Sequence, residues 1–166
     1  GELRINARSV SERDLYRTHF GHQVFGDPHF FPGDEKYSLD PLLRRGEPSL
    51  VCTDVAGLEW VRLREVHVFW SGAEHAVEIH RADNVFRALD ERGVRLPETA
   101  RLVRAVFQVK FTDSRRPRSV TIRPSNVAQY TRDDDAELIE QWLRRRGFIL
   151  TAEQREEAAH GALASA

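Results

Sequence analysis

The fold of this protein is decided by residues 101–123, which read RLVRAVFQVKFTDSRRPRSVTIR. Apolar and polar side chains alternate along the first half, a period typical of a β-strand with one buried face. The expected buried positions are Val103, Ala105, Phe107, Val109 and Phe111, with Val106 as the exception to the alternation. Residues 113–118 predict a turn, and Val120 and Ile122 continue the apolar face on a returning strand. Pro124 lacks the N–H that a strand donates, so it ends this hairpin.

A second hairpin is expected upstream, in residues 58–80. Its first strand carries Val61 and Leu63 on one face, but Val66 and Val68 on the other. The apolar parity changes around Arg64-Glu65, which predicts a β-bulge or a break between two strands. Residues 71–74 predict the turn, and residues 77–80 predict the returning strand, on which Glu78 and His80 share a face.

Helices are expected between and around the hairpins. Asp83 predicts the start of one that ends at Gly93, and residues 133–135 predict the start of another that Gly147 ends. The second carries the apolar stripe Leu138, Ile139, Trp142 and Leu143. An N-terminal helix is expected to start at Ser11 and to end at Gly21, and residues 47–54 are a strand candidate.

Two stretches of the chain resemble each other. Residues 77–85 and 120–127 each follow a first strand, each contain an Asn (Asn84 and Asn126), and each precede a helix that ends in Arg-Gly. Chance similarity between two hairpin–helix units and a true duplication explain this equally well. A duplication would let the two hairpins share one sheet, with both helices on one side.

These elements predict an α+β fold, with an antiparallel sheet of four to six strands and helices mainly on one face. At 166 residues the chain is expected to form a single domain over residues 1–150. The expected parts are a helical and loop-rich segment (1–57), a first hairpin–helix unit (58–97) and a second one (98–150). Residues 151–166, rich in Ala and Glu, are expected to form a loosely docked tail.

Composition restricts the function only broadly. The net charge of −1 means that any nucleic-acid binding needs a local basic patch. Lys36 and Lys110 are the only lysines among 25 basic residues, an arginine bias typical of GC-rich bacterial genomes. Cys52, the single cysteine, lies in an apolar run that predicts a buried thiol. With neither a signal peptide nor an apolar run long enough for a membrane span, a cytoplasmic protein is expected.

The 101–123 hairpin supplies the leading functional hypothesis. Its basic side chains lie on the polar face and in the turn: Arg104, Lys110, Arg115, Arg116, Arg118 and Arg123. A protruding basic hairpin can lie along a phosphate backbone. The sequence therefore favours a non-catalytic module that binds an anionic partner, DNA or RNA above all. No aromatic residue shares this polar face, so base stacking is not expected. The alternative is an edge hairpin protected from aggregation by its charge.

Two further hypotheses remain open. Phe30 and Phe31, adjacent in a loop-rich region, fit a protein–protein adaptor that uses these two rings and an exposed sheet edge to dock onto a partner or onto other domains of a longer chain. His19, His22 and His29 fit a metal-dependent hydrolase or nuclease, although no cysteine accompanies them. The sequence contains no phosphate-binding glycine loop and no nucleophile motif, so it predicts no cofactor and does not favour an enzyme.

Overall fold

A computed structural model describes residues 5, 7, 9–28, 30, 36–70, 75–124, 126–151 and 153–155. The chain divides into two compact units. One contains Gly1–Asp34 with Glu156–Ala166, and the other contains Glu35–Arg155. Most of the expected tail, residues 156–166, lies outside the described residues, as does the expected turn at residues 71–74.

The first unit contains one described helix, α1 (Val10–Phe25). It starts at Ser9 rather than at Ser11, because the Ser9 hydroxyl accepts a hydrogen bond from the Glu12 N–H at 3.1 Å. It also passes through Gly21 and ends at Gly26, whose φ of 72° is the left-handed conformation of a helix C-terminus. Gly21 has another role: a Cβ there would lie 2.6 Å from the Asp27 carbonyl oxygen, so the glycine lets the following chain fold back.

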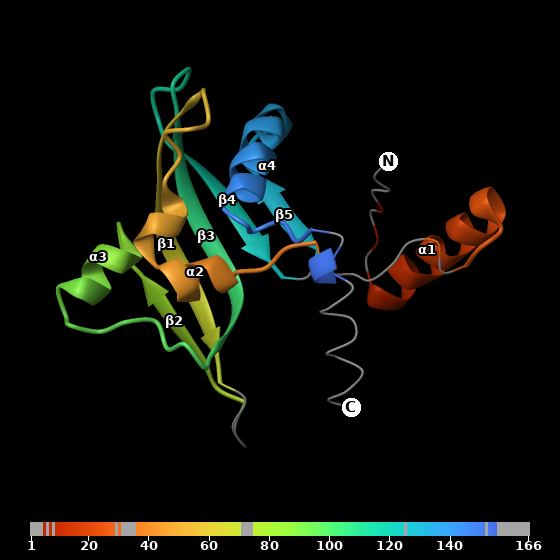
Figure 1. Ribbon diagram of the computed structural model, residues 1–166, viewed down its shortest axis with the longest axis horizontal. Helices are drawn as coiled ribbons and strands as arrows, with labels where there is room; N and C mark the ends of the chain where they lie inside the picture. Colours follow the sequence, from red (N-terminus) through yellow and green to blue (C-terminus); the bar gives the residue numbers. More distant parts are fainter. Residues whose placement is uncertain are drawn as a thin grey trace. The chain divides into compact units, whose positions relative to one another are not determined.

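The second unit is built on a five-stranded antiparallel sheet with the strand order β2-β1-β3-β4-β5 (Figure 1). The strands are β1 (Leu58–Phe69), β2 (Val77–Arg81), β3 (Arg101–Phe111), β4 (Arg118–Arg123) and β5 (Val127–Tyr130). The helices are α2 (Asp40–Arg45), α3 (Val85–Asp90) and α4 (Ala136–Arg145), with the short 3-10 turns η1 (Glu47–Leu50) and η2 (Asp133–Asp135). The predicted α+β class and the antiparallel hairpins are confirmed.

The change of apolar parity in β1 is a bulge, as expected. Leu63 pairs with Phe107 and Glu65 with Val106, so Arg64 is the extra residue. Another irregularity of the β1–β3 ladder, between His67 and Val68, changes which residue near the start of β3 faces the core. It places Leu102 in the core, 5 % exposed, where the alternation alone pointed to Val103.

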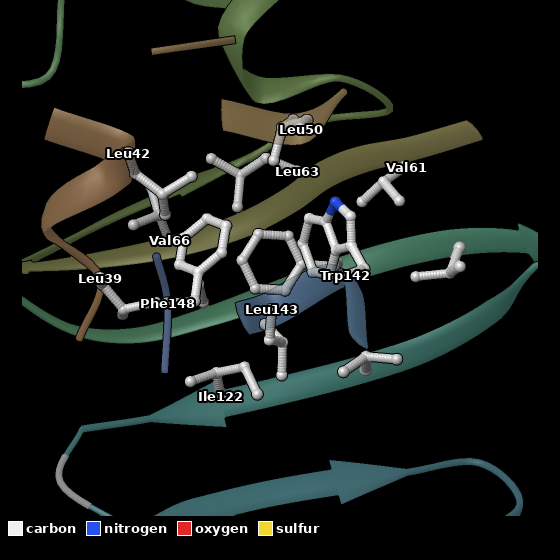
Figure 2. Close-up of a cluster of buried hydrophobic side chains, with 14 of the residues drawn as sticks. Leu39, Leu42, Leu50, Val61, Leu63, Val66, Ile122, Trp142, Leu143 and Phe148 are labelled. Atoms are coloured by element: carbon white, nitrogen blue, oxygen red, sulfur yellow. The ribbon is translucent and has the colours of Figure 1, made fainter. Parts of the chain in front are cut away.

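The hydrophobic core lies between one face of the sheet and the helices (Figure 2). Trp142 of α4 is its centre, with its ring 5.3 Å from those of Phe107 and Phe148. Its indole N–H donates a hydrogen bond to the Val51 carbonyl at 3.2 Å, which satisfies the one polar atom of this side chain. The predicted stripe of this helix is confirmed: Ile139, Trp142 and Leu143 are fully buried, and Leu138 is half-buried against the core.

Two expectations need correction. Residues 47–54 form no strand, because Pro48 and the conformation at Gly46 (φ 61°) favour the turn η1. The two hairpin–helix units are also unequal, since β5 and η2 separate the second hairpin from α4. Asn84 caps α3 through the Arg87 N–H at 3.3 Å, whereas Asn126 accepts a hydrogen bond from the distant Lys36 N–H at 3.0 Å.

Candidate nucleic-acid interface

One face of the sheet carries no helix in the described part of residues 36–155, and we call it the open face. Helices α2, α3 and α4 all supply side chains to the core on the opposite face. Register and alternation assign these residues to the open face: Trp60, Arg62, Glu65, His67 and Phe69 of β1; Val77, Ile79 and Arg81 of β2; Arg101, Arg104, Val106, Gln108 and Lys110 of β3; Ser119, Thr121 and Arg123 of β4; Val127 and Gln129 of β5. All of them except Glu65 are exposed or half-buried.

The open face is strongly basic. Its cationic residues are Arg62, Arg81, Arg101, Arg104, Lys110 and Arg123. The acids on or beside it are Glu65 and Glu59, and Glu59 lies 2.8 Å from the Lys110 ammonium. The chain as a whole has a net charge of −1, so this concentration of cations on one face is a local feature. A local basic surface of this kind attracts polyanions.

Glu65 is buried, 6 % exposed, at the centre of an ionic cluster on this face. Its Oε1 lies 2.8 Å from His67 Nε2 and 3.3 Å from Arg104 Nη1. Its Oε2 accepts a hydrogen bond from Arg81 Nε at 2.6 Å and lies 2.5 Å from Arg81 Nη2. These three partners come from β1, β3 and β2, so the cluster ties the three strands together.

The Glu65 carboxylate is ionised in this setting. Burial alone would raise the pKa of Glu65, but hydrogen bonds from His67 and Arg81 and the charges of Arg81 and Arg104 hold this pKa below its usual range. The cluster therefore fixes two guanidinium groups on the open face. Arg104 Nε is buried without a hydrogen-bond partner, and the Arg81 side chain is 69 % exposed.

The hairpin residues that the sequence pointed to fall into three groups. Arg104 and Lys110 lie on the open face and already bind acids. Arg115, Arg116 and Arg123 are exposed, and the described residues provide no acid that pairs with them. Lys110 Nζ also donates to the Ser114 carbonyl at 2.6 Å, which helps to shape the turn that carries Arg115 and Arg116.

Arg118 forms the third group, because it lies on the helix side of the sheet. It pairs with Val109 in the ladder, and its guanidinium lies 4.8 Å from the centre of the Phe111 ring. Arg118 Nη1 donates to Asp135 Oδ1 at 2.5 Å. Only 13 % of the Arg118 side chain is exposed, so this arginine links β4 to the start of α4 and does not join the open face.

Strand β1 supplies the aromatic side chains that the polar face of the 101–123 hairpin does not have. Trp60 and Phe69 lie on the open face beside β3, so aromatic rings do share this basic face. The Arg62 guanidinium lies over the Trp60 ring at 4.3 Å from its centre. Sequence reasoning did not connect Trp60 and Arg62 with the hairpin. The available signal was the alternation of Trp60 and Arg62 with the apolar Val61 and Leu63, which puts both residues on the polar side of the strand.

The aromatic and histidine candidates from the sequence belong to the first unit. Phe30 is 44 % exposed, and its ring stacks on that of Phe25 at 3.7 Å, while Phe31 lies outside the described residues. His19 and His22 lie on α1, and His29 is also outside the described residues. Among the described residues, no group of three or more His, Cys, Asp or Glu side chains is placed to hold a metal ion.

Cys52 is buried, as predicted, and burial raises the pKa of its thiol. None of the helices in the described segments is both long and apolar enough to cross a membrane.

Comparison of the chain with protein-family models, with curated proteins and with solved structures finds no match.

Proposed function

We propose that this protein is a non-catalytic module that binds single-stranded nucleic acid on the open face and on the adjoining turn of residues 112–117. One observation carries the proposal. Five arginines on this surface are exposed and have no acidic partner among the described residues: Arg62, Arg101, Arg115, Arg116 and Arg123. Unpaired guanidinium groups on one surface are suited to bidentate contacts with phosphate.

The shape and the aromatic residues favour a single strand over a duplex. An open antiparallel sheet presents a broad surface on which an extended strand can lie, and rings on it can stack with unpaired bases. Trp60 and Phe69 supply such rings next to Arg62 and Arg101. Entry into a duplex groove would instead need a narrow protruding element, and within the described segments the turn of residues 112–117 is the one that meets that description.

The Glu65 cluster limits the number of cations that are free for phosphate. Arg81 and Arg104 already pair with the Glu65 carboxylate, so they are not counted among the five unpaired arginines. This proposal extends the hairpin hypothesis from the sequence to a larger surface. The module is expected to act in the cytoplasm, on DNA or RNA.

The decisive experiment is fluorescence anisotropy with labelled single-stranded RNA, single-stranded DNA and duplex DNA. Oligonucleotides of about 16 nucleotides match the upper site size of sheet-based single-strand binders. With about five phosphate contacts, log K is expected to fall with log salt at a slope of about −3.5 for a single strand. Absence of binding at about 50 mM salt, or preference for the duplex over both single strands, would contradict the proposal.

A further inference from the structure

Strand β2 is an edge strand with an exposed apolar face. In the described part of the chain, β1 is its only neighbour in the sheet. Its side chains on the open face include Val77 and Ile79, which are 51 % and 53 % exposed. Edge strands of monomeric proteins are usually shielded by charge, a bulge or a covering segment, because their free backbone groups pair readily with another strand.

The free backbone groups of β2 belong to alternate residues. The Trp70 N–H donates to the Ala76 carbonyl at 2.9 Å, and the Ala82 N–H donates to the Arg64 carbonyl at 3.1 Å. Because hydrogen-bonded positions alternate along an antiparallel pair, residues 76, 78, 80 and 82 bond to β1. Val77, Ile79 and Arg81 therefore direct both N–H and C=O away from the sheet.

We propose that β2 pairs antiparallel with β2 of a second copy of this chain, about a two-fold axis at Ile79. In this register Ile79 opposes Ile79, and Val77 opposes Arg81 of the second copy. All the outward N–H and C=O groups of Val77, Ile79 and Arg81 are then satisfied, and the two sheets become one continuous sheet. A two-fold interface needs a self-complementary surface, and this sequence provides one.

Hydrogen-bond complementarity between a carboxylate and an imidazole selects this register. Glu78 opposes His80 of the second copy, at the closely spaced positions between hydrogen-bonded pairs where side chains approach most nearly. In each chain His80 Nε2 already lies 3.1 Å from Glu78 Oε1, so the dimer alternates acid and imidazole along one face. On the other face, the exposed Ile79 side chains cover each other.

Neighbouring registers are worse. An axis at Glu78 opposes two glutamates and leaves Arg81 without a backbone partner. An axis at His80 opposes two histidines and leaves Val77 unpaired. Registers shifted by one residue place the free N–H and C=O groups out of phase. Among these registers, the Ile79 register alone satisfies the outward backbone groups of Val77, Ile79 and Arg81 and opposes a carboxylate to an imidazole.

Cysteine cross-linking of the full chain, without nucleic acid, tests the register. At the axis, the two Cα atoms of residue 79 are expected about 5.5 Å apart, within disulfide reach. Ile79→Cys should therefore give a disulfide-linked dimer on mild oxidation. Val77→Cys is the matched control, because its two copies are about 14 Å apart in this register. The native Cys52 is buried and should not interfere. Equal cross-linking of the two variants, or none in Ile79→Cys, overturns the register.

Sedimentation velocity over a concentration series tests the dimer itself. Wild type should dimerise, and Ile79→Lys should weaken dimerisation at least about tenfold, because two lysines meet at the axis. Glu78→Lys should also weaken it, whereas the exchange Glu78→His with His80→Glu should retain it. Val127→Lys, on the opposite edge strand β5, should have no effect. A wild-type protein that stays monomeric, or an exchange variant as weak as Glu78→Lys, overturns the proposal.

Discussion

Arg118 of β4 and Asp135 at the start of α4 form a nearly buried ion pair, with 13 % and 7 % of their side chains exposed and 2.5 Å between Nη1 and Oδ1. The pair joins the sheet to the helix that carries Trp142. It also keeps this arginine of the hairpin off the open face, whereas Arg115 and Arg116 remain exposed.

Arg118→Ala is expected to lower the free energy of unfolding by about 3 kcal/mol, because it leaves the Asp135 carboxylate buried without its partner. Arg116→Ala, at an exposed position of the same hairpin, should change it by less than about 0.5 kcal/mol. Urea unfolding followed by circular dichroism measures both. Arg118→Met and Asp135→Leu should also be measured alone and together. The double variant should lose less free energy of unfolding than the sum of these two single losses, and strictly additive losses would contradict the pairing.

Replacement of Arg115 and Arg116 by Ala is expected to weaken nucleic-acid binding and to make the salt slope shallower by about 1.4, at about 0.7 per phosphate contact. Arg92→Ala with Arg95→Ala is the matched control, since it removes two exposed arginines outside the open face and the turn. Anisotropy titrations at several salt concentrations measure the slopes. If the control pair changes the slope as much as the turn pair, binding depends on total charge and not on this surface.

Trp60→Ala is expected to weaken binding of a single strand by about tenfold, since stacking of one base contributes about 1–3 kcal/mol. Trp60→Phe retains a ring and should keep most of the affinity. The salt slope should stay unchanged in both variants, because no phosphate contact is removed. Loss of affinity together with a shallower slope would indicate that Trp60 acts through Arg62 and not through a base.

Glu65→Gln is expected to destabilise the protein by about 1.5 kcal/mol at neutral pH, because the amide replaces charge-assisted hydrogen bonds to Arg81 and His67 by weaker neutral ones. The pKa of Glu65 is lower in the folded protein than its ordinary value of 4.5. The ionised Glu65 side chain therefore stabilises the folded state at pH values above 4.5. This stabilisation is lost as the pH falls through the lower pKa of the folded state. Wild type should lose this stability on acidification, and Glu65→Gln should show a flatter pH dependence there.

The same Glu65→Gln variant should bind nucleic acid more tightly than wild type, with a steeper salt slope, because two guanidinium groups are released for phosphate contacts. Stability and binding would then change in opposite directions. A variant that loses both in proportion would show that Glu65 acts on binding only by maintaining the fold.

Much of the architecture is local enough to be predicted. The alternation around Phe107, the parity change at Arg64-Glu65 and the stripe around Trp142 each depend on neighbours in sequence, and each is confirmed. Strand β5 was not predicted, because Val127–Tyr130 has only four residues and gains its place from pairing with β4. Residues 47–54 looked like a strand because their apolar content was clear, but Pro48 and Gly46 decide the backbone there.

The sequence by itself determined the α+β class, the two hairpins and the arginine-rich turn, since periodicity and turn residues act over a few positions. Only the tertiary structure decided which arginines share a surface. Strand pairing brings β1 beside β3, so Trp60 and Arg62 join the basic hairpin, and Glu65 meets Arg81 and Arg104. Packing of α4 on the sheet, in turn, places Asp135 beside Arg118 on the helix side, so Arg118 does not join the basic open face. These contacts link residues distant in sequence, and their register depends on bulges and on the shared core rather than on any local pattern.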